Sequence, residues 1–149
     1  MDESKLTDAT SLEAVQRRID SHGFLSWLGF TVESVEEGRV VATIPRDPKI
    51  TNNFGPDGQV HGGVAATLID TVGGIVCRTT LDPDNEGVAT IDLDVSYLRS
   101  ASGDLRATAE VVRVGGTVGV ADVTVESNGS DGEWEEVAVG RGSYRVFRG

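Results

Sequence analysis

The segment from His61 to Asp70 combines two features that could do chemistry together. His61 precedes a double glycine, Gly62 and Gly63, and the apolar pattern that follows predicts a helix over residues 64–76 with Asp70 inside it. Other residue types would stabilise a helix more than two glycines do, and a buried carboxylate must be hydrogen-bonded or neutralised. Both choices therefore point to function rather than to packing.

The start of such a helix suits the binding of a developing negative charge. The first backbone N–H groups of a helix have no intrahelical partner and carry the positive end of the helix dipole. Glycine lets a ligand approach the backbone closely, so the N–H of Gly62 or Gly63 could polarise a substrate carbonyl as an oxyanion donor. Asp70 would then act as the base or as the nucleophile.

Geometry requires a second chain for this chemistry. Gly62 and Asp70 are eight residues apart, about 12 Å along a helix, which is too far for both to reach one carbonyl carbon. If two copies of the helix lie antiparallel across a twofold axis, the start of one helix meets the middle of the other, and two equivalent sites form.

Length and composition predict one domain of residues 1–149. Cys77 is the only cysteine, which excludes an intrachain disulfide, and only two histidines are present, so neither a metal centre nor another cofactor is expected. No segment resembles a signal peptide or a membrane span, which predicts a cytoplasmic protein that does not enter a membrane.

The net charge of −11, from 24 acidic and 13 basic residues, indicates a salt-rich habitat. Only two of the basic residues are lysines. This composition is typical of proteins from organisms that accumulate salt, because salt screens the mutual repulsion of surface carboxylates. An ordinary acidic mesophilic protein is the alternative. In either case nonspecific binding to nucleic acid is disfavoured, and an anionic ligand needs its own arginines.

The remaining pattern predicts the elements around the site. We expect frayed residues 1–10, a helix over 11–23, a short apolar helical turn over 24–28, a loop over 45–58, and strands over 30–35, 40–44, 88–98, 105–114, 118–126 and 137–147. In the third strand, Ala89, Ile91, Leu93, Val95 and Tyr97 alternate with Thr90, Asp92, Asp94 and Ser96, which predicts two opposite faces. The class is α+β: one curved antiparallel sheet, with two strands before the long helix and four after it, wrapped around that helix.

Several motifs together resemble one family. They are Asn-x-x-Gly, then His-Gly-Gly and Leu-x-Asp on one helix, then Tyr-Leu-Arg-x-Ala at the end of a strand. Over residues 25–147 the chain resembles the hotdog-fold acyl-CoA thioesterases of the phenylacetate-pathway (PaaI-like) group. The resemblance implies a hotdog fold and a homodimer or homotetramer. It also implies an acyl-CoA substrate and no separate cofactor, because CoA is part of the substrate.

The resemblance also implies roles for individual residues. The oxyanion donor falls on Gly62, and the acid from the other subunit falls on Asp70. Asn52 or Asn53 helps to place the thioester or the water; the loop before the double glycine is longer than in the family, so both remain candidates. Thr90 supplies a hydroxyl. His61, which precedes Gly62, is a further candidate for a catalytic role. The implied CoA-binding positions are Tyr97, Leu98, Arg99, Ser100, Ala101, Arg113, Gly115, Gly116 and Thr117. Gly63 and, on the last strand, Arg145 are further candidates for substrate binding.

Each signal also has a structural interpretation. His61 could be a polar residue that ends a loop and holds it with its ring, and this interpretation is favoured. Asp70 could be exposed at a groove, but its place in an apolar helix favours catalysis. Cys77 is expected in the core, and residues 115–116 are expected to form a hairpin turn rather than a phosphate loop.

Three functions remain for this sequence. The first is hydrolysis of an acyl-CoA thioester, by direct attack of Asp70 or by its activation of water. The second is hydration or dehydration of an acyl thioester, although such enzymes place their acid at the helix start. The third is binding of acyl-CoA without turnover, which the retention of Asp70 with Gly62 disfavours.

Overall fold

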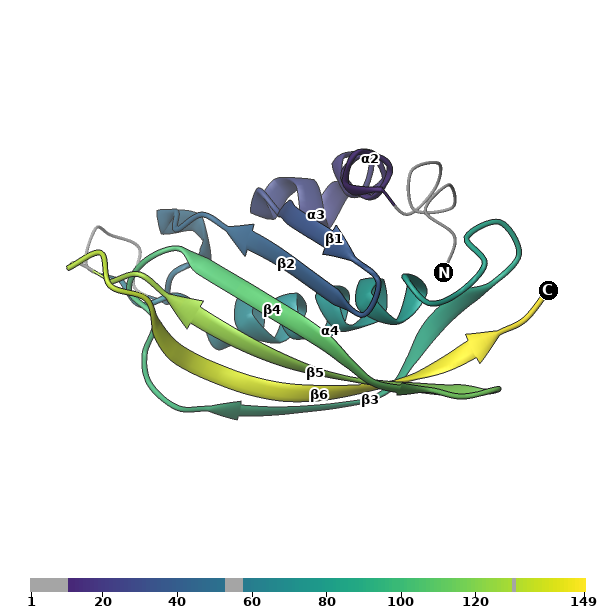
Figure 1. Cartoon of the computed structure of the whole chain (residues 1–149). Helices are drawn as coiled ribbons and strands as arrows, with labels where there is room; N and C mark the ends of the chain where they lie inside the picture. Colours follow the sequence, from purple (N-terminus) through teal and green to yellow (C-terminus); the bar gives the residue numbers. More distant parts are fainter. Residues whose placement is uncertain (1–10, 53–57, 130) are drawn as a thin grey trace.

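A curved antiparallel sheet wraps around one long helix, α4 (Gly62–Arg78) (Figure 1). The computed structural model describes residues 11–52, 58–129 and 131–149. The strands are β1 (Thr31–Glu36), β2 (Arg39–Ile44), β3 (Gly87–Tyr97), β4 (Leu105–Val114), β5 (Val118–Ser127) and β6 (Glu135–Phe147). They lie in the order β1-β2-β4-β5-β6-β3, and all neighbours are antiparallel. The predicted α+β class, with two strands before the helix and four after it, is confirmed.

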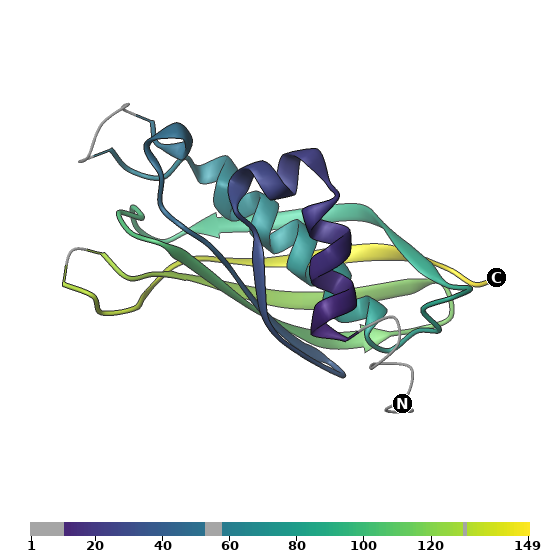
Figure 2. The ribbon, with the colours of Figure 1, turned by 90° about the horizontal axis from the view of Figure 1, so that it is seen from above.

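Helix α4 is apolar around most of its circumference because it lies between two layers. The concave face of the sheet packs against one side, and α2 (Leu12–Asp20) and α3 (Gly23–Leu28) lie over the other side (Figure 2). Leu68, Ile69, Val72 and Val76 are fully buried in this position.

No helix in the described part of the chain is long and apolar enough to cross a membrane.

The predicted helix over residues 11–23 is interrupted near its end. Ser11 caps α2, which ends at Asp20, and the Nδ1 atom of His22 then accepts the N–H of Leu25 at 3.2 Å to begin α3. The predicted apolar turn therefore forms a helix of its own. It ends at Gly29, whose φ of 75° suits glycine. The residues expected to be frayed, 1–10, lie outside the described residues.

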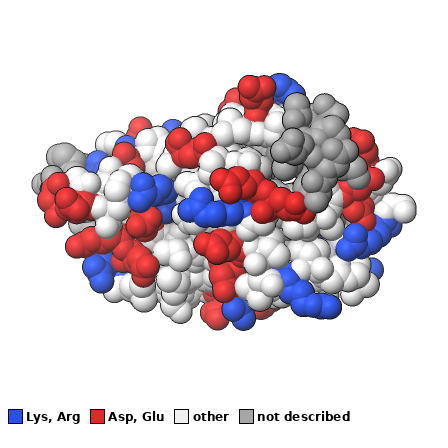
Figure 3. All heavy atoms as spheres, viewed as in Figure 1, with Lys and Arg blue, Asp and Glu red and all other residues white. Residues whose placement is uncertain are grey.

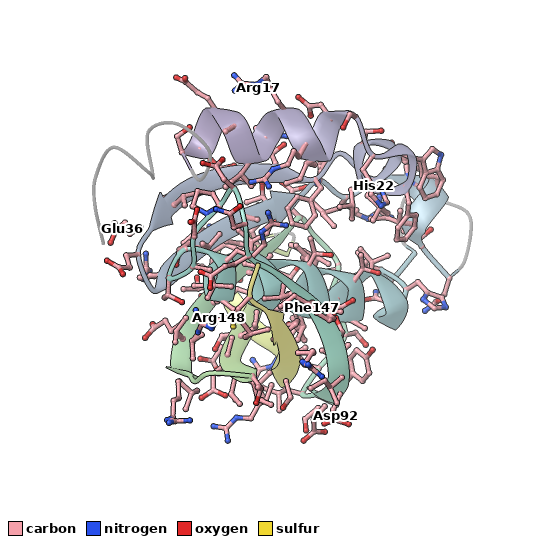
Figure 4. The ribbon with its side chains drawn as sticks, turned by 90° about the vertical axis from the view of Figure 1, so that its right-hand side faces the viewer. Arg17, His22, Glu36, Asp92, Phe147 and Arg148 are labelled. Atoms are coloured by element: carbon pink, nitrogen blue, oxygen red, sulfur yellow. The ribbon has the colours of Figure 1, made fainter. Side chains whose placement is uncertain are left out.

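A β-bulge in β3 overturns the predicted strict alternation of this strand. The pairing of β3 with β6 shifts between Thr90 and Asp92, so Ile91 is an extra residue. Such an insertion moves the following side chains to the opposite face. Thr90 therefore points to α4 as Leu93 does, whereas the prediction placed these two residues on opposite faces. Ile91 is 57% exposed, and Asp92 points away from the sheet (Figure 4).

Tyr144 of β6 fixes the middle of α4 to the sheet. Its buried hydroxyl donates to the backbone carbonyl of Asp70 at 2.9 Å. A Cβ atom on Gly73 or Gly142 would lie 2.2 Å from this hydroxyl, so both positions need glycine for close approach. Burial, followed by the negative charge of Asp70, raises the pKa of Tyr144, which keeps the hydroxyl protonated as a donor.

Carboxylates are spread across the surface of the protein. On the face shown in Figure 3, acidic side chains form several groups with basic side chains between them. The described ion pairs are at least partly exposed, among them Arg141 with Asp122 at 2.6 Å and Arg99 with Glu135 at 3.2 Å. Exposed pairs of this kind contribute little to stability, so they do not offset the repulsion between carboxylates in a protein with a net charge of −11.

We expect the melting temperature to rise as KCl increases from 0.1 to 1 M. The screening length shortens from about 10 to about 3 Å over this range, which weakens the repulsion between carboxylates. Thermal unfolding followed by circular dichroism measures the effect. A matched series in sucrose separates charge screening from the general exclusion of cosolvents. A melting temperature that falls steadily toward molar KCl would contradict the halophilic interpretation.

Candidate active site

The start of α4 is fixed by backbone contacts from three parts of the chain. Thr51 and Val60 form an isolated antiparallel bridge that closes the preceding loop. The N–H of His61 donates to the carbonyl of Ile50 at 2.8 Å, at the end of the short 3-10 helix η1 (Pro48–Ile50). The N–H of Val60 donates to the carbonyl of Ala101 at 2.9 Å. These contacts hold the double glycine in a defined place.

His61 caps the helix and thereby distinguishes the two glycines. Its Nδ1 atom accepts the N–H of Gly63 at 2.8 Å, so this N–H is occupied and is not an oxyanion donor in this state. The N–H of Gly62, at the first helical position, has no acceptor among the described residues. Of the two donors that the sequence left open, the geometry favours Gly62. The ring of His61 thus contacts the start of the helix, whereas its structural interpretation expected the ring to hold the preceding loop.

Tyr97 packs against the same glycine from the end of β3. Its hydroxyl donates to the carbonyl of Gly62 at 2.8 Å, and a Cβ atom on Gly62 would lie 3.1 Å from the ring. A side chain at this position would have to displace the exposed ring of Tyr97 by a few tenths of an ångström, so the contact is tight without requiring glycine. The tyrosine that the resemblance assigned to CoA binding contacts the predicted donor residue.

Asp70 presents its carboxylate from the middle of α4. Its Oδ1 atom accepts a hydrogen bond from the hydroxyl of Thr90 at 2.6 Å. Thr90 and Tyr144 are cross-strand partners of β3 and β6, so one pair of residues holds both the side chain and the main chain of Asp70. The carboxylate is half-buried and borders a hollow of about 360 Å³ whose other walls come from α3 and β3.

Gly62 faces a different hollow from Asp70. The hollow at Gly62, also about 360 Å³, lies between the start of α4 and the segment after β3. Asp70 does not border it, and Gly62 does not border the hollow of Asp70. The structure thus agrees with the estimate of about 12 Å along the helix between the two residues. One chain presents a donor and a carboxylate at two separate places.

The predicted CoA-binding residues fall into two groups. The first group borders the hollow of Gly62 and comprises Tyr97, Leu98, Arg99, Ser100 and Ala101. The second group, with Arg113, Arg145 and the hairpin Gly115–Thr117 between β4 and β5, lies near the opposite end of β3 (Figure 1). Within one chain the two groups do not form one site.

Arg148 is a contact residue that the sequence analysis missed. Its guanidinium donates to the carbonyl oxygens of Gly115 and Gly116 at 2.8 and 3.2 Å and pairs with Glu86 at 2.7 Å. It thereby fixes the predicted hairpin turn from the end of β6, beside Phe147 (Figure 4). Its neighbours in the sequence gave no signal of this role. The guanidinium of Arg145 lies 5.3 Å from the ring centre of Phe147.

The other predicted site residues have simple positions. Asn52 is exposed, and its N–H donates to the carbonyl of Gln59 at 2.9 Å; Asn53 lies outside the described residues. Cys77 is buried as predicted, and burial raises the pKa of its thiol to about 11, which disfavours a thiolate. Within the described ranges, no group of three or more His, Cys, Asp or Glu residues could hold a metal ion.

Comparisons with known sequences show which protein family this chain resembles. The sequence pattern of the thioesterase superfamily matches residues 57–132. A protein of Halobacterium salinarum, provisionally named an esterase, is 54% identical over 144 residues, which cover 95% of this chain and 94% of its own. The medium/long-chain acyl-CoA thioesterase YigI of Escherichia coli is 30% identical over 113 residues, which cover 67% of this chain and 72% of that protein.

Solved structures share the arrangement of sheet and helix. A thioesterase from Haemophilus influenzae has a TM-score of 0.79 at 23% identity and covers 93% of this chain and 91% of its own. A thioesterase family protein from Silicibacter pomeroyi has a TM-score of 0.80 at 25% identity, with coverage of 91% and 96%. The hotdog fold predicted from the sequence is confirmed. The chain belongs to the thioesterase superfamily, and hydrolysis of a thioester is the general type of its activity.

Proposed function

We propose that the protein hydrolyses acyl-CoA thioesters at sites shared between two subunits. In each site the N–H of Gly62 from one subunit binds the thioester oxygen, and Asp70 of the other subunit supplies the carboxylate. The observation that carries this proposal is the separation of Gly62 and Asp70 into two hollows on one helix. Each half is well positioned and each lacks the other.

The proposed reaction follows from the two halves. Attack on the carbonyl carbon places negative charge on its oxygen, where the free N–H at the positive end of α4 stabilises it. Asp70 either attacks the carbon to form an anhydride that water then cleaves, or removes a proton from the attacking water. Collapse of the intermediate breaks the carbon–sulfur bond and releases CoA. Thr90 fixes the direction of the carboxylate in both routes.

Strand β3 offers a surface on which the second subunit can bind. It is an edge of the sheet, with a strand on one side only in the described part of the chain, and Ile91, Tyr97 and Leu98 near it are about half exposed. A long exposed edge strand favours pairing with another chain. Antiparallel pairing of two β3 strands across a twofold axis would set the two α4 helices antiparallel, as the shared site requires.

The same pairing would unite the two predicted CoA-binding groups. They lie near opposite ends of β3, and antiparallel pairing brings opposite ends of two copies together (Figure 1). The hairpin Gly115–Thr117 of one subunit would then approach the segment 97–101 of the other. Arginines suit such a site because a guanidinium can bind phosphate with two parallel hydrogen bonds. A dimer is the minimal unit, and a dimer of dimers fits the same geometry.

The relatives support the substrate class and the habitat. The name of the Escherichia coli relative specifies medium- and long-chain acyl-CoA, and the Halobacterium salinarum relative comes from a salt-loving organism. We accordingly propose that the substrate of this protein is an acyl-CoA and that the protein works in a salt-rich cytoplasm. We also place it in the PaaI-like group that its motifs resemble. The position of Asp70 in mid-helix favours hydrolysis over hydration of the acyl group.

Substitution of Asp70 by Asn or Ala should lower acyl-CoA hydrolysis at least 100-fold while the protein stays folded, because the amide and the methyl group are neither basic nor nucleophilic. The assay follows release of CoA with a thiol reagent, and circular dichroism confirms the fold. Glu136→Gln is the matched control, because it removes the same charge from an exposed position on β6. Full activity in folded Asp70→Ala would refute the proposed role.

Replacement of Thr90 by Val should lower kcat about tenfold or more, because a hydrogen bond to a charged group contributes about 1.5–3 kcal/mol. Valine keeps the branched shape and removes the donor, whereas Thr90→Ser keeps the donor. The measurement compares kcat for the two variants on one acyl-CoA. Equal activity of the Val and Ser variants would show that the contact with Asp70 does not serve turnover.

A mixing experiment tests the shared site. Gly62→Pro removes the proposed donor at a helix position that tolerates proline, and Asp70→Ala removes the carboxylate. Each variant alone should be inactive. In a mixed dimer one site carries both changes and the other neither, so random reassembly of equal amounts should restore about a quarter of wild-type activity. Differential tags report the mixed dimers. If these form and remain inactive, each site lies within one chain.

A further inference from the structure

Two aromatic side chains of α3 are exposed beside the site. Phe24 is 52% exposed and Trp27 is 50% exposed. They are three residues apart on one helix and therefore lie near each other on its surface. A single exposed aromatic residue needs no explanation, but an apolar pair that borders a hollow indicates a binding surface.

These aromatic residues border a groove that leads to the carboxylate. The hollow of Asp70 has Phe24 and Thr67 in its walls, and both also border a third hollow of about 340 Å³. The third hollow adds Trp27 and Val64 and reaches the start of α4. The two hollows therefore adjoin along the boundary between α3 and α4, and we name them together the α3 groove. The surface of its walls is mainly apolar, although Asp70, Lys49, two histidines and several threonines also border it.

Lys49 gives Trp27 a defined position. Its ammonium group lies 4.6 Å from the centre of the indole ring and also donates to the backbone carbonyl of Trp27. The chain contains only two lysines, so this contact is not a common surface pair of the protein. A cation over one face of the indole stabilises the exposed ring where it borders the groove.

We propose that the α3 groove binds the acyl group of the substrate and selects for long apolar chains; this inference rests on the proposed function. The reacting carbonyl carbon must lie close to Asp70, so the acyl group begins in the hollow that Phe24 borders. CoA is polar and negatively charged, which leaves the acyl group as the part of the substrate that suits apolar walls. A longer chain then reaches Trp27 along α4.

The first test measures kcat/KM for acetyl-, butyryl-, hexanoyl- and decanoyl-CoA. Each methylene that enters an apolar groove contributes about 0.8 kcal/mol, which corresponds to about a fourfold gain in kcat/KM, until the groove is filled. Phe24→Ala and Trp27→Ala should lower kcat/KM at least tenfold for decanoyl-CoA and less than about twofold for acetyl-CoA. Val112→Ala is the matched control, because Val112 is 51% exposed on β4, outside the groove.

The kinetic test has two results that overturn the inference. If neither variant changes the dependence on chain length, the groove does not bind the acyl group. If either variant lowers the rates for acetyl- and decanoyl-CoA equally and also changes the mass of the assembly, the aromatic pair is a contact between subunits instead. Hydrolysis of some acyl-CoA remains in both cases, so the proposed function stands.

A binding test separates the inference from turnover. Trp27 and Trp134 are the two tryptophans of the chain, and Trp134 stacks 4.1 Å from the guanidinium of Arg106, away from the groove. Trp134→Phe keeps that stacking and leaves Trp27 as the only indole. In this variant with Asp70→Asn, decanoyl-CoA should shift the emission of Trp27 to the blue, and free CoA should not.

The emission result decides the inference even if no hydrolysis is found. A shift with decanoyl-CoA in a protein that hydrolyses no acyl-CoA supports the acyl groove and refutes the proposed reaction. An unchanged emission at concentrations that saturate turnover in the wild type overturns the groove and leaves the reaction intact.

Discussion

A single pair of cross-strand neighbours holds the one carboxylate of helix α4. Thr90 and Tyr144 face each other across β3 and β6; the first binds the side chain of Asp70 and the second binds its backbone carbonyl. The direction of the carboxylate and the height of the helix above the sheet are therefore set together. The tyrosine hydroxyl fits only because Gly73 and Gly142 lack a Cβ atom. Glycines that weaken a helix and a strand thus have a specific packing reason here.

The start of the same helix is organised by a different set of contacts. A helix begins with N–H groups that have no partner, and most proteins satisfy them with side chains. Here His61 satisfies the N–H of Gly63, while Tyr97 binds the carbonyl of Gly62 and leaves its N–H open. This division explains why histidine and two glycines stand together. Because the capping contact of His61 occupies the N–H of Gly63, the N–H of Gly62 is the one that stays open.

Most of the fold could be predicted from the sequence because the apolar periodicity is strong. The long helix and the six strands were predicted within a few residues of their bounds. Among the predicted site residues, Thr90 hydrogen-bonds to Asp70 and Gly62 begins α4, and their roles in catalysis remain predictions. The bulge at Ile91 could not be predicted, because a single inserted residue has no sequence signal of its own. Its effect was large: the strict alternation placed Thr90 on the wrong face of β3.

Long-range contacts account for the other omissions. Tyr144 lies 74 residues from Asp70, and nothing in the local sequence connects them. The aromatic residues of α3 were recognised as an apolar cluster, but their exposure depends on how α3 lies over α4. The contact of Arg148 with the hairpin at Gly115 likewise depends on the end of β6 reaching it. Periodicity reports which face of an element is buried, whereas these contacts depend on which elements meet.

Strand β3 connects the two halves of the site to the edge of the sheet. At one end Thr90 binds Asp70, and at the other end Tyr97 binds Gly62. Between them the strand has only β6 beside it in the described part of the chain. Pairing of this edge with a second subunit would restrain both contacts at once, because the two side chains belong to one continuous strand. In the proposed dimer, the strand that joins the two subunits is also the strand that contacts Gly62 and Asp70. The formation of that dimer and the order of its sites would therefore depend on the same element.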